Sequence, residues 1–339
     1  MKAGKLTGSI FFILGLLLVA VAAILRFSVA PGLTELSDRF NREIILVGTL
    51  SIPNPDPAAG GAMITLPVEA ATTSSVRSLS DDSGVVSFDT QTYLTPRAVD
   101  SQPISNTSFT YAVNRSTFEQ TDPPAGMSVI DQKGGVTVNF PPNSNHENLT
   151  TYNAVVQEAQ PLEYQGTKSK SGRTLDIYTT DASGPVRNPD VLHVLQENLG
   201  PRFGTDGTTA PKLALLALGI PAVLLDSAPE QVPVSFSQAD KTEIWVDPTL
   251  GSIVNQIGTT TVTTVFELPG QDIPVPASIT KLEMDRSVVS SSISDLDESD
   301  SQLPLVTTWI PVALLVLGIV FAILAVRLLT RPTRPTSAT

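Results

Sequence analysis

The sequence predicts a membrane-anchored α+β protein in which two transmembrane helices flank a mainly β extracytoplasmic domain, a sandwich or a barrel, with a small helical insertion. Three observations lead to this fold class. A long apolar run lies near each end of the 339-residue chain, and β-branched residues alternate with polar ones between them. All 33 acidic residues lie within residues 27–305, so the apolar ends carry only basic charge.

Each of the two apolar segments is long enough to cross a bilayer. Residues 10–25 are unbroken apolar, which predicts a cytoplasmic tip and a first membrane helix within residues 1–26. Residues 306–329 form the second predicted span, and residues 330–339 form a cytoplasmic tail. Because basic residues flank both spans on their outer ends, we expect a double-pass protein of the cell membrane with both termini in the cytoplasm.

A cleaved signal peptide is the alternative for the first apolar segment. The triplet Ser28-Val29-Ala30 has the small residues that a cleavage site needs. Pro31 would then follow the cut, which is a poor context, and Arg26 ends the apolar run as basic residues often end an anchor. We therefore expect an uncleaved anchor.

Residues 27–282 are predicted to form the β-rich extracytoplasmic domain. Many short strand candidates follow one another closely, and this spacing favours a sandwich or a barrel over βαβ units. The strand candidates are residues 43–51, 63–70, 72–79, 85–92, 135–140, 174–180, 232–237, 242–247 and 259–268.

A helical insertion is predicted at about residues 188–226. Its first helix has Asn188 as a possible cap, Pro189 in the first turn and Gly200 at the end. We expect its apolar residues to share one face: Val191, Leu192, Leu195 and Leu199. Residues 283–305 are acidic and rich in serine, and we interpret them as a connector to the second span.

The second part of the insertion, residues 213–225, is apolar throughout but too short to cross a bilayer. It could pack as a buried helical turn on the strands. It could instead form an apolar mouth for a hydrophobic ligand, a partner or a membrane. The candidate mouth residues are Leu213, Leu216, Ile220, Val223 and Leu224.

The sequence offers no recognisable arrangement for catalysis, for a metal or for a cofactor. The chain has no cysteine and lacks nucleophile-elbow, phosphate-loop, dinucleotide-binding and H-E-x-x-H motifs. We expect His146 to lie solvated in a polar loop and His193 to lie on the amphipathic helix without a catalytic role. The middle region has 15 basic residues against 33 acidic ones, a formal charge of −18, which disfavours nucleic-acid binding.

Several segments together resemble a known family. These are LRFSVAPGL (25–33), YAVNRST (111–117), GVTVNFPPN (135–143), PLEYQG (161–166) and TEIWVDPTLG (242–251). They resemble a family of actinobacterial envelope proteins often labelled as a PorA-type porin family. The two-anchor plan is also similar to that of the scavenger-receptor class B lipid receptors, which carry hydrophobic ligands through a tunnel in the outer domain.

The most specific shared element is I-W-V-D-P-T-x-G, at residues 244–251. We interpret it as a structural turn between two strands, with proline and glycine at positions that a turn favours. The turn residues are Trp245, Asp247, Pro248 and Gly251. The chain departs from the family pattern at residues 153–155, after Tyr152.

These observations lead us to expect a non-enzymatic, membrane-tethered protein that binds or passes a lipid or other hydrophobic molecule in the cell envelope. A scaffold or sensor with an envelope protein partner and no ligand is the main alternative. A pore and a hydrolase based on carboxylates are the further alternatives. Its expected partners are the membrane and a hydrophobic small molecule.

Overall fold

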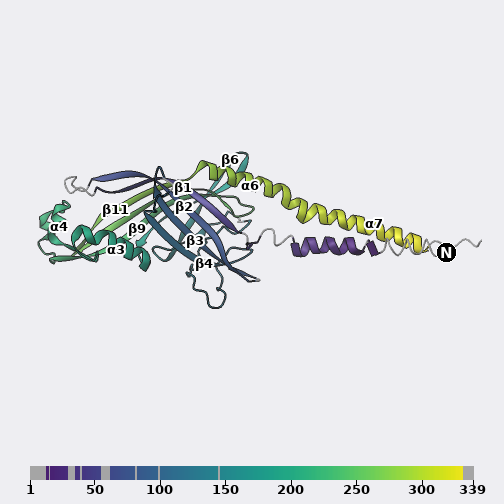
Figure 1. Ribbon diagram of the computed structural model, residues 1–339, viewed down its shortest axis with the longest axis horizontal. Coiled ribbons are helices and arrows are strands. Elements are labelled where there is room, and N and C mark those ends of the chain that lie inside the picture. The colour runs from purple at the N-terminus through teal and green to yellow at the C-terminus, as the bar shows by residue number, and fades with distance from the viewer. Residues whose placement is uncertain are drawn as a thin grey trace, which may run out of the picture. The chain divides into compact units, whose positions relative to one another are not determined.

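The structure is a computed structural model that describes residues 13–14, 16–29, 35–38, 40–54, 62–80, 82–97, 100–143 and 146–330 (Figure 1). The chain divides into two compact units. One unit, called here the helical unit, comprises Met1–Leu36 and Ser294–Thr339. The other, called here the β domain, comprises Ser37–Ile293.

The β domain is built on a single 11-stranded sheet in which neighbouring strands are antiparallel. The order across the sheet is β4-β3-β2-β1-β11-β10-β9-β7-β6-β5, and β8 pairs with β9. The strands are β1 (Asn41–Pro53), β2 (Met63–Leu79), β3 (Ser83–Leu94), β4 (Ser105–Asn114), β5 (Leu149–Asn153), β6 (Glu158–Lys170), β7 (Arg173–Pro185), β8 (Thr209–Pro211), β9 (Gln231–Val246), β10 (Ile253–Leu268) and β11 (Gln271–Met284).

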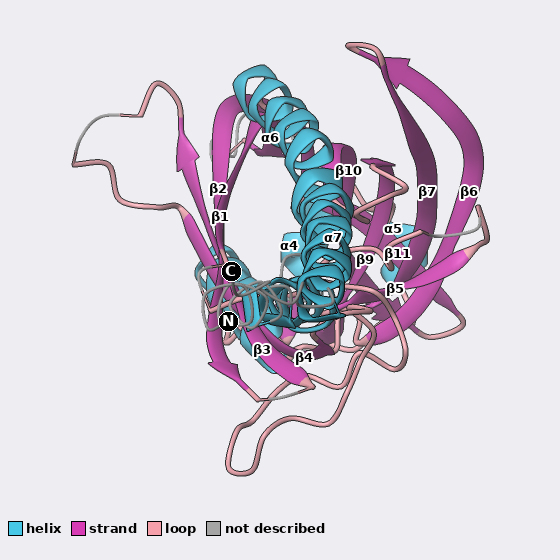
Figure 2. Cartoon of the chain, turned by 90° about the vertical axis from the view of Figure 1, so that its right-hand side faces the viewer, coloured by secondary structure: helices cyan, strands magenta, loops and turns pink. Residues whose placement is uncertain are grey.

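The sequence left a sandwich and a barrel open, and the sheet curls into a half-barrel, a single curved layer (Figure 2). Its two ends come close together, because Tyr111 on β4 and Tyr152 on β5 have ring centroids 6.5 Å apart. The connection between β4 and β5, residues 115–148, contacts both edges of the sheet, and we call it the covering loop. Ile130 donates its backbone N–H to Thr110 of β4, and Val136 donates its backbone N–H to Thr150 of β5. Backbone groups at the ends of the sheet are therefore paired rather than left open.

The predicted strands differ from the observed ones in three ways. The strands β4, β5, β6, β8 and β11 have no counterpart among the predicted ones. Residues 63–70 and 72–79 belong to one strand, β2, and residues 232–237 and 242–247 belong to one strand, β9. The prediction of a strand at residues 135–140 is wrong, because this segment makes only an isolated bridge, from Val136 to Thr151. β-branched alternation marks extended backbone there, but the segment is a covering loop rather than a strand of the sheet.

The chain enters and leaves the β domain on neighbouring strands. β1 and β11 are antiparallel partners, with Leu46 opposite Met284, so the start of β1 and the end of β11 lie at the same end of the sheet. We call this end the base. The insertion between β7 and β9 lies at the opposite end, which we call the tip (Figure 1).

The insertion consists of α3 (Pro189–Phe203), β8, α4 (Lys212–Ala217) and α5 (Ala222–Leu225). The predicted cap of α3 is confirmed, since the Asn188 side chain accepts from the N–H groups of Asp190 and Val191. The helix continues past the predicted end to Phe203, and Gly204 caps it with a φ of 64°. The four apolar residues predicted to share a face are half-buried, whereas His193 is exposed.

Helix α6 (Arg286–Pro304) begins directly after β11, and Asp285 lies at its N-terminal cap. The Asp285 carboxylate accepts from the hydroxyl of Ser287 and, at 2.8 Å, from its backbone N–H. These two hydrogen bonds lower the pKa of Asp285 below its ordinary value. A group with a lowered folded-state pKa stabilises the fold above its unfolded pKa, and this contribution is lost as the pH falls through the folded pKa.

We expect Asp285→Ala to lower the free energy of unfolding by about 1 kcal/mol at pH 7, the usual cost of losing a helix cap. The difference from the unmodified protein should shrink as the pH falls below about 4, where the unfolded carboxylate protonates. Urea unfolding followed by circular dichroism at pH 7 and pH 3 measures this. Asp285→Asn is the control, because asparagine also caps helices and does not titrate. A loss of the same size at both pH values would contradict the assignment.

The helical unit contains α7 (Ile310–Thr330), which follows α6 through a stretch of π-helix, η3 (Leu305–Trp309). Within the described residues one continuous helix, Arg286–Arg327, is long and apolar enough to cross a membrane. The N-terminal apolar helix is described over Leu16–Phe27, which is shorter than a span. Residues 10–12 and 15 of the predicted first span lie outside the described residues, so two-span anchoring is not confirmed.

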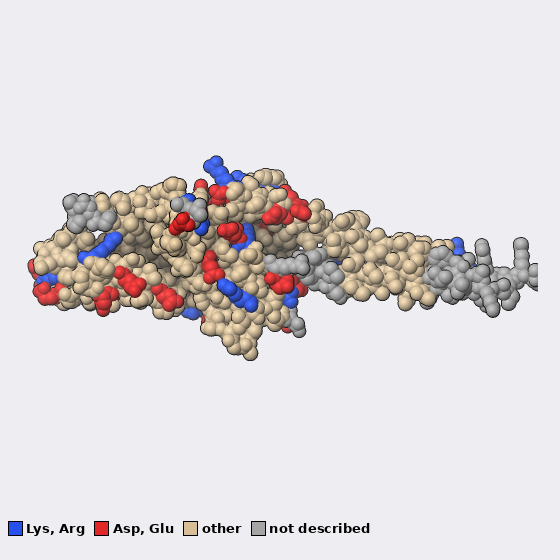
Figure 3. Space-filling model, in the orientation of Figure 1, with Lys and Arg blue, Asp and Glu red and all other residues tan. Residues whose placement is uncertain are grey.

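Charged residues are absent from the apolar part of the helical unit, Ile310–Val326. Figure 3 shows acidic and basic side chains scattered over the β domain and an uncharged surface along the apolar helices. The end of the N-terminal helix, η1 (Leu25–Val29), packs against η3 in the helical unit. Trp309, the last residue of η3, is two-thirds exposed, as suits a ring at a membrane–water interface.

Candidate functional site

The inner face of the curved sheet can be identified from strand register. Residues directly opposite each other on antiparallel strands point to the same side, and successive residues alternate sides. Val68, Tyr178 and Phe266 share one side by register and are at most 1% exposed. This side is the inner face of the half-barrel.

A group of aliphatic residues covers the inner face of β2, β1 and β11. Ile52 lies opposite Ile64, Leu50 opposite Leu66, and Gly48 lies between Val68 and Leu282. Along β1 the group extends from Leu46 to Ile52, a length of about 20 Å at the usual strand rise. We call this group the apolar stripe: Leu46, Leu50, Ile52, Ile64, Leu66 and Leu282.

The apolar stripe is only half-buried, in contrast to the hydrophobic cores at the tip and the base. The tip core joins the insertion to the ends of β9 and β10: Ala210, Leu215, Ile220, Leu225, Val232, Phe266 and Leu268. The base core lies under the covering loop: Phe140, Leu162, Tyr178 and Val246. Large aliphatic side chains that line a concave face without full burial are typical of a site for an apolar ligand.

The inner face of β10, β9 and β7 is polar and centres on Asp240. Thr260 donates to Asp240 Oδ1 at 2.6 Å, and Gln238 donates to Oδ2 at 2.7 Å. Asn153, the last residue of β5, donates to the same Oδ2 at 2.6 Å. We call Asp240, Thr260, Gln238, Thr242 and Thr180 the polar wall.

Thr180 in the polar wall has a buried hydroxyl oxygen without a hydrogen-bond partner among the described residues. It lies opposite Thr242, and Asp240 lies one row further along β9, opposite Ala182. Diagonal neighbours of this kind are about 7–8 Å apart. The unpartnered hydroxyl is therefore close to the carboxylate on the same face.

The outer face of the same strands is charged. One row across the sheet places Glu69, Glu283 and Glu243 at the same level, and the next row carries Lys281, Lys241 and Asp181. Lys241 and Asp181 form an ion pair of 2.8 Å in which both side chains are about 70% exposed. The sheet is thus amphipathic, with charged residues on its outer face and the apolar stripe on its inner face.

The predicted mouth residues divide between surface and core. Leu213, Val223 and Leu216 are 76%, 73% and 40% exposed at the tip. Ile220 is buried in the tip core, and Leu224 packs against that core. Ile220 and Leu224 thus fit the reading of a buried helical turn, and contact of the exposed residues with a ligand stays a prediction.

Three of the predicted turn residues, Asp247, Pro248 and Gly251, lie between β9 and β10, whereas Trp245 lies within β9. Asp247 Oδ1 accepts from the N–H groups of Thr249 and Leu250, and Asp247 Oδ2 accepts from Arg173 Nε at 2.7 Å. Both side chains of this ion pair are nearly buried, with 10% of Arg173 and 3% of Asp247 exposed. Pro248 follows in the turn itself.

The other two predicted turn residues, Trp245 and Gly251, make contacts that hold this corner, the turn between β9 and β10. Trp245 is 7% exposed, its Nε1 donates to Glu243 at 2.6 Å, and Lys168 Nζ lies 4.2 Å from its ring centroid. Gly251 has a φ of 67°, and its carbonyl accepts from the N–H of Phe140 in the covering loop. The corner therefore joins the sheet to the loop that covers its base.

His146 is 51% exposed in a loop, as predicted, but it also makes a contact that the sequence did not indicate. Its Nδ1 lies 3.0 Å from Oδ2 of Asp176, whose side chain is fully buried, and its ring centroid is 5.0 Å from that of Tyr164. Burial, and then the charge of Asp176, raise the pKa of Tyr164. His146 and Asp176 are 30 positions apart in the chain, and no local sequence pattern indicates that they are in contact. His193 is 70% exposed beside Glu197.

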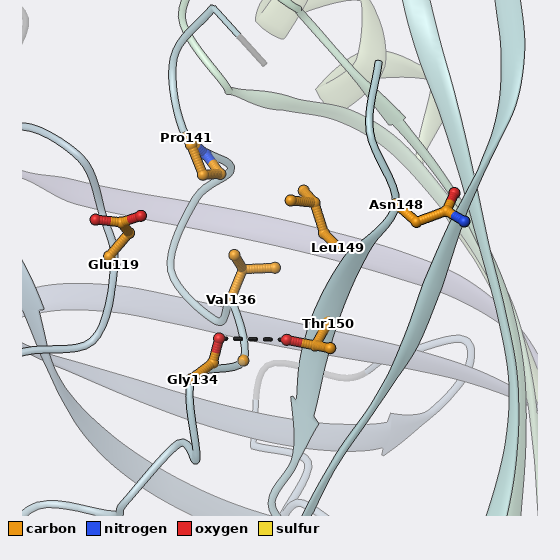
Figure 4. A pocket seen from close by; sticks show the side chains of 8 residues that line it. Glu119, Gly134, Val136, Pro141, Asn148, Leu149 and Thr150 are labelled. Atoms are coloured by element: carbon orange, nitrogen blue, oxygen red, sulfur yellow. Dashed lines mark hydrogen bonds between the residues drawn. The ribbon is translucent and has the colours of Figure 1, made fainter. Parts of the chain in front are cut away.

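A separate pocket of about 300 Å³ lies under the covering loop. Figure 4 shows Val136, Pro141 and Leu149 grouped around it, with Glu119 and Asn148 on opposite sides. Thr150 donates to the carbonyl of Gly134 at 3.2 Å across its floor. Among the described residues no group of three His, Asp or Glu side chains is placed to hold a metal ion.

Comparisons with known proteins identify the family. A solved structure, a putative MaoC domain protein dehydratase from Chloroflexus aurantiacus J-10-fl, aligns at 11% identity over 79% of this chain and 80% of that chain. Its TM-score of 0.12 is too low to support any argument about fold or function. A search among curated proteins gave no match. The family described as porin PorA matches residues 7–327, and the chain therefore belongs to the porin PorA family.

Proposed function

We propose that this protein is a non-enzymatic, membrane-tethered protein whose β domain binds or passes a lipid or another hydrophobic molecule. The observation that carries the proposal is the half-buried apolar stripe on the inner face. Covering the part of each side chain that is still exposed contributes about 25 cal/mol per Å² of apolar surface removed from water, so several such contacts together can hold an acyl chain.

The distribution of charge favours a tethered half-barrel over a pore formed by the strands. A barrel that crosses a membrane needs an outward-facing apolar band, because lipid tails contact that surface. Here the outer rows carry Glu69, Glu283, Glu243, Lys281 and Lys241. The apolar helix Arg286–Arg327 is the better candidate for contact with lipid, and it supports association with a membrane.

The proposal includes two spans with both termini in the cytoplasm. The N-terminal apolar helix and η3 pack together, as two neighbouring spans would. Lys2 and Lys5 precede the first apolar segment, and Arg331 and Arg334 follow the second, which is the charge pattern of cytoplasmic flanks. The β domain would then lie outside the cytoplasm.

Neighbouring residues of β1 offer a matched test, because Leu50 lies on the inner face and Thr49 on the outer face. The full-length protein in detergent is labelled with a fatty acid that carries a photoreactive diazirine in its tail, and labelled peptides are mapped by mass spectrometry. We expect Leu50→Gln to lower labelling of β1 and β2 about tenfold, which corresponds to about 1.4 kcal/mol. Thr49→Gln should leave labelling unchanged.

Equal labelling of the two variants would contradict the proposal, as would labels found only on outer-face residues. Recovery of a stable protein partner together with an unlabelled inner face would favour the scaffold alternative. Circular dichroism of both variants checks that they fold alike, so a loss of labelling can be assigned to the inner face.

A further inference from the structure

One row of the sheet changes from polar to apolar across four strands. Asp240 of β9 lies opposite Thr260 of β10, which lies opposite Thr280 of β11. Thr280 in turn lies opposite Leu50 of β1, and all four side chains point to the inner face. Three strand spacings of about 4.8 Å separate Asp240 from Leu50, or about 14 Å along the curve. This is the scale on which an amphiphile changes from head group to hydrocarbon.

We propose that the polar wall is a head-group subsite for an uncharged, hydroxyl-rich amphiphile, a glycolipid, whose acyl chain lies on the apolar stripe. This inference rests on the proposed function and specifies its ligand class. The subsite would comprise Asp240 with its three donors and the hydroxyls of Thr180 and Thr242.

The hydrogen-bonding capacity of the wall suits hydroxyl groups. A carboxylate has about four acceptor positions, and Asp240 uses three of them for Thr260, Gln238 and Asn153. One position remains for a ligand donor. The unpartnered hydroxyl of Thr180 can both donate and accept, as a sugar hydroxyl does.

Charge argues against an anionic or a cationic head at this subsite. The basic residues of the neighbouring strands, Lys241 and Lys281, lie on the outer face, so an anion would meet Asp240 without a compensating charge. An ammonium group would need more of the carboxylate than one free position, and it would have to displace Asn153 or Gln238. A neutral hydroxyl needs neither change.

A purely structural role for the polar wall predicts a different result at Thr180. If the wall only joins the turn at Asn153 to β9, a hydroxyl without a partner contributes nothing, and Thr180→Val should leave ligand selectivity unchanged. Burying a polar group without a hydrogen bond is unfavourable, so this variant should be at least as stable as the parent protein. Thr180→Val therefore tests recognition without disturbing the hydrogen bonds of Asp240.

The test uses the full-length protein in detergent and three diazirine-tailed probes: monoglucosyl diacylglycerol, phosphatidylglycerol and a free fatty acid. We expect the glucosyl lipid to label the inner face more strongly than phosphatidylglycerol. Thr180→Val should reduce this preference about fivefold, in line with the loss of one hydrogen bond. Asp240→Asn should reduce it at least as much, and both variants should keep the fatty-acid labelling. Thr261→Val, on the outer face of β10, is the control and should change nothing.

The outcomes separate this inference from the proposed function. If the fatty acid labels the apolar stripe but the head-group preference is absent, is reversed toward phosphatidylglycerol or survives both variants, the subsite is overturned and the proposed function stands. If no probe labels the inner face, both fail. A reduced preference in Thr180→Val and Asp240→Asn, with unchanged thermal unfolding of Thr180→Val, supports the subsite.

Discussion

Arg173→Ala is expected to lower the free energy of unfolding by about 3–5 kcal/mol, because it leaves the charge of Asp247 buried without its partner. Arg173 Nε lies 2.7 Å from Asp247 Oδ2, and only 3% of the Asp247 side chain is exposed. The N–H groups of Thr249 and Leu250 would remain as donors to the carboxylate, but neither carries a charge. Urea unfolding of the full-length protein in detergent, followed by circular dichroism, measures the loss.

Lys241→Ala is the matched control, since it also breaks an ion pair within the β domain. Lys241 and Asp181 are both about 70% exposed, so solvent screens their attraction. The control should change the free energy of unfolding by less than about 0.5 kcal/mol. Similar small losses in both variants would show that the buried pair does not hold the corner between β9 and β10.

Gly251→Ala is expected to lower the free energy of unfolding by about 3 kcal/mol or more, for two physical reasons. A φ of 67° costs a residue with a Cβ about 1–2 kcal/mol. In addition, a Cβ built on Gly251 would lie 1.9 Å from the carbonyl oxygen of Phe140, a backbone atom that cannot rotate away. The covering loop at Phe140 would have to move, and the same unfolding measurement would register the cost.

Gly270→Ala separates these two contributions. Gly270 has a φ of 83°, but a Cβ added there meets nothing within 4 Å. Gly270→Ala should lower the free energy of unfolding only by the cost of a positive φ, about 1–2 kcal/mol. If both glycine variants lost the same amount, close contact between the turn and the covering loop would not contribute to stability.

Local signals in the sequence predicted the helical insertion well and the strand boundaries poorly. Asn188 and Pro189 mark the start of α3 because capping depends on adjacent residues alone. Residues 238–241, Gln-Ala-Asp-Lys, indicate a turn by composition, yet they pair continuously within β9. Long strands with polar residues on both faces lack the alternation that sequence reading depends on. β11 was missed for a related reason, since Pro274 and Pro276 are atypical of strands.

The candidate site depends on contacts that no local pattern encodes. The apolar stripe combines β1 and β2 with β11, which begins 192 positions after the end of β2. Asn153 reaches Asp240 from the end of β5, 87 positions earlier in the chain. Sequence alone identified the exposed leucines of the insertion as candidates, because a continuous apolar run is visible without a fold. Register between distant strands, and hence the inner face, requires the three-dimensional structure.

The adjacency of β1 and β11 has a mechanical consequence. Force applied through the two chain ends acts at the base, where antiparallel partners would separate one hydrogen bond after another rather than slide past each other. Six residue pairs join β1 to β11, whereas thirteen join β1 to β2. Tension that draws the two ends apart would therefore unzip this seam first and split the aliphatic lining between Leu50 and Leu282.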